Sequence, residues 1–175
     1  MKNKKLLQLI YGALLAALCC VATMVIRIPT IGTNGYVNIG DTIVLLSSWL
    51  LGNPYGALAA GIGSALADLL AGYGSYVPGT FVIKFLMAFV SYIIYSIISR
   101  TPLKKFGAYI VSGIIAELIM VFGYFAYEAT LLGYGLAAAS SIPSNFIQGG
   151  TCLVLGVLLI GALQGTQLMV SKSKS

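Results

Sequence analysis

The chain has 175 residues, of which 59% are hydrophobic and only 8% charged, and its mean hydropathy is +0.98. A soluble domain carries roughly 25% charged residues, so this composition excludes a water-soluble fold and predicts an all-α integral membrane protein. The net charge of +6 does not indicate nucleic acid as a partner, because the basic residues follow a pattern of membrane topology.

Two residue types limit the chemistry. The chain has no histidine, which excludes His-based metal sites, His general bases and Ser-His-Asp triads. Cys19, Cys20 and Cys152 lie in apolar stretches without a C-x-x-C motif, and we interpret them as small buried side chains. The sequence therefore predicts no metal site and no cofactor.

The first apolar segment, Leu6–Ile28, follows a basic start at Met1–Lys5. A cleaved signal peptide has the same basic start, but its apolar core holds only ~7–15 residues. Here the uninterrupted run Leu6–Ile26 holds 21. We interpret this segment as a membrane span that is retained in the protein.

Five more apolar segments follow, separated by turns rich in Gly, Pro and Asn. They are Ile39–Leu51, Tyr55–Ala71, Thr80–Ser99, Phe106–Leu132 and Ile142–Val170. Spans need ~20 apolar residues each, so residues 1–175 form a single transmembrane domain of six helices. We expect the helix in the last segment to be shorter than the apolar stretch itself, or to be tilted in the membrane. The second is too short to cross straight, and we expect a half-length helix inside the bundle or, with the third, a re-entrant hairpin.

Three basic clusters set the predicted orientation. They consist of Lys2, Lys4 and Lys5 before the first segment, Arg100, Lys104 and Lys105 after the fourth, and Lys172 and Lys174 after the sixth. Cytoplasmic loops carry the excess of Lys and Arg. With six spans all three clusters fall on one side, so both termini are predicted to be cytoplasmic in a multi-pass protein of the cell membrane.

Small residues recur at helical spacing in two segments. Gly56, Ala60 and Ser64 form one stripe of the third segment, and small residues let helices approach closely in lipid. We therefore place this helix centrally. Ala13 and Ala17 in the first segment form the same kind of close-packing patch.

All four acidic residues lie inside apolar segments, and two basic residues lie inside or at the edge of them. The acids are Asp41, Asp68, Glu117 and Glu128, and the bases are Arg27 and Lys84. A charge at the bilayer centre costs at least ~2.5–3.5 kcal/mol, so such residues usually face the bundle interior and carry function. In the predicted topology all but Glu117 lie in the outer half, as a pocket open to the outside requires.

Aromatic and amide side chains accompany these charges. Glu117, Tyr124 and Glu128 share one helix face; Asn145 and Gln148 begin the sixth segment. Tyr73 and Tyr76 lie in the loop above Lys84. Aromatic walls with a few polar groups are the usual make-up of a small-ligand pocket.

Each of these features also has a purely structural interpretation. Arg27 with Asp41, and Asp68 with Lys84, would form simple ion pairs, and the tyrosines would belong to an interfacial belt. Asn145 and Gln148 would satisfy loop backbone. Glu117 would then have no cation left, so it is either protonated or has another partner. The surplus acid disfavours an anionic ligand and suits a neutral or basic heterocycle.

Five motifs occur in an order that resembles the substrate-binding S component of energy-coupling factor (ECF) vitamin transporters. They are G-Y-V-N-I-G-D at 35–41, G-S-A-L-A-D at 63–68, Y-V-P at 76–78 followed by Lys84, G-Y-F-x-Y-E at 123–128 and I-P-S-N-F-x-Q-G at 142–149. The resemblance covers residues ~6–165. Each motif alone is loose, and their order, the length and the six-span plan make the match specific.

The resemblance implies a six-helix protein that captures a vitamin from outside with high affinity. It implies partners as well: a transmembrane T component that carries two ATPases, on which the S component docks through an Ala-x-x-x-Ala patch matched by Ala13 and Ala17. The S component is expected to topple in the membrane to release its cargo. The chain has no phosphate loop of the G-x-x-x-x-G-K-[ST] type, so energy for uphill transport must come from another chain or an ion gradient.

The resemblance also completes the set of predicted substrate-binding residues. They are Asn38, Asp68, Tyr73, Tyr76, Lys84, Glu117, Tyr124, Glu128, Asn145 and Gln148. An acid-rich, tyrosine-lined site resembles the branch that handles vitamin B6 or the hydroxymethylpyrimidine precursor of thiamine, and riboflavin and cobalamin remain open. The expected ligand is a ring stacked on tyrosine, with Glu128 or Glu117 as acceptor.

Three other functions remain as alternatives. In-span carboxylates suit a stand-alone ion-coupled carrier, although such carriers commonly contain internal repeats and none is evident here. An intramembrane acid-pair enzyme would need two carboxylates at one centre, but Glu117 and Glu128 are about 16 Å apart along a helix at 1.5 Å per residue. A purely structural subunit would bind no small molecule.

Overall fold

The computed structural model describes residues 2–30, 32–100 and 105–165. Within them the chain is almost entirely helical, with a short hairpin and one 3₁₀ helix. In chain order the elements are α1 (Lys2–Val25), β1 (Ile28–Pro29), β2 (Tyr36–Val37), α2 (Asp41–Leu51), α3 (Tyr55–Leu70), α4 (Val77–Ile98), α5 (Lys105–Thr130), η1 (Gly135–Ser141) and α6 (Ile142–Gly165).

The helices differ in length. Within the described residues α1, α4, α5 and the stretch of η1 with α6 are long and apolar enough to cross a membrane, whereas α2 and α3 are shorter. At 1.5 Å per residue α2 reaches only ~16 Å, about half of a ~30 Å hydrocarbon core. Eight of its 11 residues are buried, as expected for a half-length helix packed inside the bundle. The count of six crossings stays a prediction.

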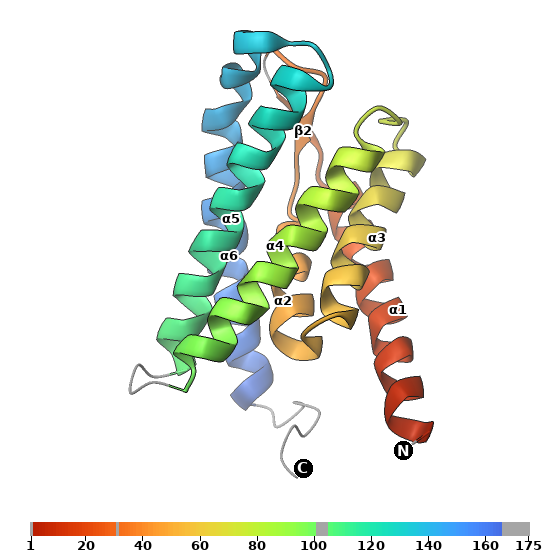
Figure 1. The fold of residues 1–175 in the computed structure, drawn as a ribbon, viewed down its shortest axis with the longest axis vertical. Helices are drawn as coiled ribbons and strands as arrows, with labels where there is room; N and C mark the ends of the chain where they lie inside the picture. The colour runs from red at the N-terminus through yellow and green to blue at the C-terminus, as the bar shows by residue number, and fades with distance from the viewer. Residues whose placement is uncertain (1, 31, 101–104, 166–175) are drawn as a thin grey trace.

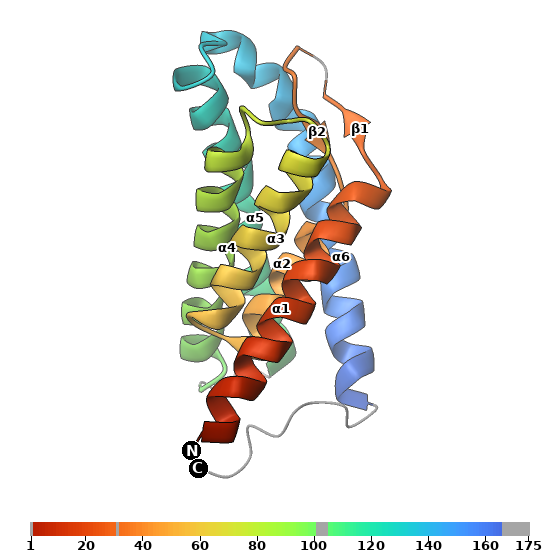
Figure 2. The ribbon, with the colours of Figure 1, turned by 90° about the vertical axis from the view of Figure 1, so that its right-hand side faces the viewer.

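The two ends of the bundle are unlike (Figure 1). We call one the loop end, because it carries the β1–β2 hairpin, the turn from Gly72 to Tyr76 and η1. At the other, the terminal end, α1 begins and α6 ends, and Figure 2 shows the same arrangement from the side. The hairpin is antiparallel, pairing Ile28 with Val37 and Pro29 with Tyr36.

Among the described residues, helix α3 packs against α1, α2 and α4 but not against α5 or α6. The central position predicted from its small residues is therefore wrong, because the helix that contacts all five others is α2. A Cβ atom added to Gly63 would lie 2.3 Å from the carbonyl oxygen of Ala16 on α1, so only glycine permits this approach. The large side chains Leu58, Ile62 and Leu66 recur every fourth residue on the opposite, exposed side, which suits contact with lipid.

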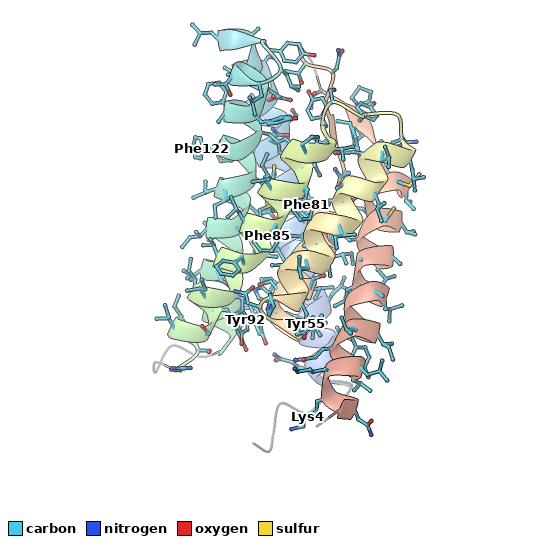
Figure 3. All side chains as sticks on the ribbon, turned by 45° about the vertical axis from the view of Figure 1, so that its right-hand side comes forward. Lys4, Tyr55, Phe81, Phe85, Tyr92 and Phe122 are labelled. Atoms are coloured by element: carbon cyan, nitrogen blue, oxygen red, sulfur yellow. The ribbon has the colours of Figure 1, made fainter. Side chains whose placement is uncertain are left out.

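An apolar core closes the middle of the bundle. Leu45, Met87, Met120 and Ile160 come from α2, α4, α5 and α6 and are fully buried. Below them Trp49 donates its indole N–H to Ser91 at 3.2 Å and Ser112 at 3.1 Å. Figure 3 shows Phe122 pointing away from α5, and its 56% exposure is typical of a lipid-facing position.

Several helix ends and two of the loops differ from the sequence prediction. We expected the fourth helix to begin at Thr80, after a turn containing Pro78, but α4 begins at Val77 because proline is well tolerated in the first helical turn. The predicted loop before the sixth helix contains η1, and the β1–β2 hairpin was not predicted. Lys104, Lys172 and Lys174 lie outside the described residues, so the basic clusters remain an argument from sequence.

Candidate functional site

A small polar cavity lies at the loop end, where the hairpin meets four helices. Its volume is about 20 Å³, enough for roughly one water molecule, and we call it the inner cavity. It is lined by Thr30, Gly35, Tyr36, Asn38, Asp68, Tyr76, Thr80, Tyr124, Glu128, Asn145 and Gln148.

Asp68 lies on the α3 side of this cavity and is 4% exposed. Its carboxylate accepts a hydrogen bond of 2.5 Å from the hydroxyl of Tyr36 on β2. Nearby, Thr80 and Tyr124 share a hydrogen bond of 2.9 Å between their hydroxyl groups. Tyr36 therefore attaches the hairpin to an acid of the helical bundle.

Glu128 is the corresponding acid on α5 and is 2% exposed. Its Oε1 accepts a hydrogen bond from Tyr76 at 3.0 Å, and its Oε2 accepts one from Ser141 at 2.7 Å. Gly35 fits closely against it, because an added Cβ would lie 3.1 Å from Glu128 Oε1. One carboxylate thus joins the start of α4 to the end of η1, and the hairpin packs close to it at Gly35.

The two tyrosines that donate to these acids lie outside the membrane-spanning helices. Burial, followed by the negative charge of Asp68, raises the pKa of the Tyr36 phenol above its usual value. Burial and the charge of Glu128 do the same to the pKa of Tyr76. Both phenols therefore keep their protons and act as donors at physiological pH.

A charged network forms the floor beneath the cavity. Lys84 on α4 donates to Asp41 at the start of α2, and the two side chains are 3% and 0% exposed. Gln148 donates its side-chain N–H to the second oxygen of Asp41 at 2.5 Å and accepts the backbone N–H of Asn38 at 2.6 Å. The ammonium of Lys84 also lies 5.2 Å from the ring centre of Tyr124, within range of a cation–π contact.

This network corrects both predicted ion pairs. Arg27 does not pair with Asp41, and Lys84 does not pair with Asp68; instead Lys84 pairs with Asp41. The reason is that α2 packs against α4 and brings the Asp41 carboxylate to the ammonium. Arg27 is exposed at the end of α1.

Glu117 lies on α5, 6% exposed, and neither carboxyl oxygen has a hydrogen-bond partner among the described residues. It is close enough to Asp41 and Lys84 to interact with both electrostatically. Gly149 on α6 packs directly against it, since an added Cβ would lie 3.0 Å from the Glu117 Cβ. A buried carboxyl with no partner is unusual in a folded protein.

Seven of the ten residues predicted to bind substrate line the inner cavity. They are Asn38, Asp68, Tyr76, Tyr124, Glu128, Asn145 and Gln148. Lys84 belongs to the floor beneath the cavity. Glu117 and Tyr73 do not line it. The cavity is also lined by four residues that were not predicted, although two of them lie within the motif at 35–41: Thr30, Gly35, Tyr36 and Thr80.

Tyr73 lines a second space, which we call the outer hollow. Its volume is about 390 Å³, and it is lined by Pro29, Thr33, Asn34, Gly35, Gly72, Tyr73 and Ser75. The ring centre of Tyr73 lies 4.6 Å from that of Tyr36 and 6.4 Å from that of Tyr76. Gly35 borders both spaces, so one layer of residues separates them.

The charges of the site are unbalanced toward acid. Asp41, Asp68, Glu117 and Glu128 are buried here with Lys84 as the buried base. Among the described residues no group of three or more His, Cys, Asp or Glu side chains is placed to hold a metal ion. The site suits a neutral or basic molecule with several donor groups better than an anion.

The predicted docking patch lies near the middle of α1 (Lys2–Val25), on its open side. Ala13 and Ala17 are one turn apart and both exposed, while α1 packs its other side against α3. Both are therefore accessible on the surface of the chain.

Comparison with known proteins gives a consistent result. Residues 3–165 match the family described as ECF-type riboflavin transporter, S component. A protein of Pyrococcus woesei, described as "Uncharacterized protein in gap 3'region", is 32% identical over 136 residues, covering 78% of this chain and 87% of that protein. The fold is similar to a solved chain described under "Structure and mechanism of the S component of a bacterial ECF transporter", with a TM-score of 0.70, 20% identity, and coverage of 95% of this chain and 99% of that one.

Proposed function

The chain belongs to the ECF-type riboflavin transporter S component family, and from this premise we propose that it captures riboflavin at the loop end of the bundle. The family consists of membrane-embedded substrate-binding subunits of vitamin transporters, not enzymes. We also propose the orientation of this chain in the membrane and the partners with which it works.

One observation carries the proposal. Hydrogen-bonding side chains from the hairpin and four helices converge on the inner cavity, while the apolar core closes the bundle below them. Buried polar groups are costly in a membrane protein, so their concentration at one end is best explained by a ligand that uses them. The ligand enters and leaves at this end while the core is intact.

The chemistry of riboflavin matches these groups. Its isoalloxazine ring offers a flat face to the tyrosines and both donors and acceptors along its edge. Its ribityl chain offers hydroxyl groups that Asn145, Gln148 and Lys84 can bind, with Glu128 and Asp68 as acceptors. The molecule is uncharged at neutral pH, in keeping with a site that has surplus acid.

Vitamin B6 and hydroxymethylpyrimidine are the second candidates. They are favoured by the acid-rich, tyrosine-lined walls and by the small volume of the inner cavity, about 20 Å³. Cobalamin is many times larger than either ring and suits this cavity least. The family description favours riboflavin over both.

Every candidate requires the inner cavity to enlarge. Tyr36 and Tyr76 occupy its upper side and are held there by Asp68 and Glu128. We expect donor groups of the ligand to take the place of the two tyrosine hydroxyls. The hairpin could then move outward while Asp68 and Glu128 each keep a hydrogen-bond donor. Glu117, which has no partner among the described residues, gains one from the enlarged site.

The orientation and partners follow from the same proposal. Lys4, Lys5, Arg100 and Lys105 lie at the terminal end. An excess of Lys and Arg supports a cytoplasmic position for that end, and the loop end would then face outside. A T component with two ATPases would then supply the energy, and the exposed pair Ala13 and Ala17 would form part of its docking surface. A stand-alone ion-coupled carrier remains the alternative, because the acids of the site could bind protons.

The test is calorimetric titration of the purified protein in detergent with riboflavin, pyridoxine and hydroxymethylpyrimidine. We expect tight 1:1 binding of riboflavin, weakened at least ~10-fold in Glu128→Gln and in Lys84→Ala, since a lost charged hydrogen bond is worth about 1.5–3 kcal/mol. Tyr134→Phe, at the loop end but outside the cavity lining, is the control. A folded protein that binds none of the three would refute the proposal, and uptake by this chain alone, abolished by a protonophore, would favour the carrier.

A further inference from the structure

The loop end contains two spaces of very different size. The outer hollow measures about 390 Å³ and the inner cavity about 20 Å³. Pockets for small molecules usually measure ~300–1,000 Å³. In this conformation the outer hollow has the volume that a ring molecule requires, whereas the inner cavity must enlarge before such a molecule can enter it.

Tyr36 and Tyr76 line the inner cavity and pack beside Tyr73 of the outer hollow, and we call these two residues the wall. Tyr36 and Tyr76 donate their hydroxyl hydrogens inward, to Asp68 and Glu128. The ring of Tyr73 packs on the outer side of this wall, at 4.6 Å from Tyr36. A molecule in contact with Tyr73 thus lies next to the residues that must move for it to pass.

The lining of the outer hollow defines the chemistry it accepts. Tyr73 provides an aromatic ring, and Thr33, Asn34 and Ser75 provide uncharged hydrogen-bonding groups. Among the described residues that line it, none carries a charged side chain. Such a surface suits a flat, uncharged ring with hydroxyl substituents, and it offers nothing to balance a phosphate or an ammonium group.

We propose that the outer hollow is an encounter site, where the ring of the vitamin stacks on Tyr73 before the wall opens. The inference rests on the proposed function, and it assigns to Tyr73 a contact made on entry and not in the final complex. Binding is then a two-step process: riboflavin first equilibrates with the outer hollow and then passes into the enlarged inner cavity.

The experiment is stopped-flow fluorescence of riboflavin mixed with the full chain in detergent. For the wild type, the observed rate of the slow phase should rise with riboflavin concentration and then reach a maximum, because the encounter site becomes fully occupied. In Tyr73→Ala the half-saturation concentration should rise about fivefold or more, the usual effect of losing an aromatic stack. The equilibrium Kd should stay within about twofold, since the endpoints are unchanged.

Two variants control for general damage to the loop end. Tyr73→Phe keeps the ring and should keep the wild-type half-saturation concentration. Tyr134→Ala removes a tyrosine from the same end that lines neither space and should change neither quantity.

The outcomes separate this inference from the proposed function. Tight riboflavin binding with an observed rate that stays linear in concentration, or with a half-saturation unaffected in Tyr73→Ala, overturns the encounter site alone. A Kd that weakens in proportion to the half-saturation would show that Tyr73 contacts the ligand in the final complex, which also overturns it. No riboflavin binding at equilibrium overturns the proposed function and the encounter site together.

Discussion

Lys84 and Asp41 form a buried ion pair beneath the inner cavity, 3% and 0% exposed, with Gln148 bound to the second oxygen of the carboxylate. Removing one partner from a buried pair leaves an uncompensated charge and costs about 3–5 kcal/mol. We expect Asp41→Asn or Lys84→Met to lower the thermal midpoint of the ligand-free protein by about 6–20 °C. The double variant should recover most of this loss. A double variant whose midpoint falls by the sum of the two single losses would show that the residues are not coupled.

Glu117 and Glu128 should respond oppositely to the same substitution. Glu117→Leu removes a buried carboxyl that has no hydrogen-bond partner among the described residues, so the midpoint of the ligand-free protein should rise by several degrees, while riboflavin binding weakens. Glu128→Leu takes the acceptor from Tyr76 and Ser141 and should lower the midpoint, because each unpaired donor costs about 1–3 kcal/mol. Thermal unfolding in detergent measures both. A clear destabilisation by Glu117→Leu would mean that its carboxyl has a partner in the folded protein.

Two glycines provide a matched pair for helix packing. An added Cβ at Gly63 would meet the carbonyl oxygen of Ala16 at 2.3 Å, whereas nothing lies within 4 Å of one at Gly161. We expect Gly63→Ala to push α1 and α3 apart and lower the midpoint. Gly161→Ala should raise it by about 2–4 °C, because alanine favours a helix by ~1 kcal/mol over glycine. Equal midpoints for the two variants would argue against the close α1–α3 contact.

Alkaline pH should act on stability through Tyr76. Burial and the charge of Glu128 raise its pKa in the folded protein, so the folded chain holds the proton more tightly than the unfolded chain, whose tyrosines titrate near pH ~10. The stabilisation is complete below that pH and is lost as the pH rises toward the folded pKa. Thermal midpoints measured from pH 8 to 11 should therefore fall above about pH 10. The decline should be smaller in Tyr76→Phe, and an identical decline in both proteins would contradict the assignment.

Composition, segment length, helical period and the order of the motifs were enough to predict the class of the protein and seven of the residues that line the inner cavity. Its apolar segments predicted the six helices, and the length of Ile39–Leu51 predicted a short one packed inside. The placement of Asp41, Asp68, Glu128 and Lys84 in apolar segments predicted a polar site toward one end, because charges inside a membrane bundle are retained for a purpose. These inferences hold because chain length, hydropathy and helical period act locally along the chain.

Which of these residues contact one another depends on how the helices pack in the folded protein. Asp68 and Lys84 are each about one turn from the same loop, so the sequence suggested that they form an ion pair. In the structure α2 packs against α4, and Lys84 pairs with Asp41 instead. Asp68 and Glu128 then bind the hydroxyls of Tyr36 and Tyr76. Helical periodicity fixes which residues share a face of one helix, but it does not fix the rotation or the neighbours of that helix. Those depend on close contacts such as Gly63 against Ala16, which exist only when the whole bundle is assembled.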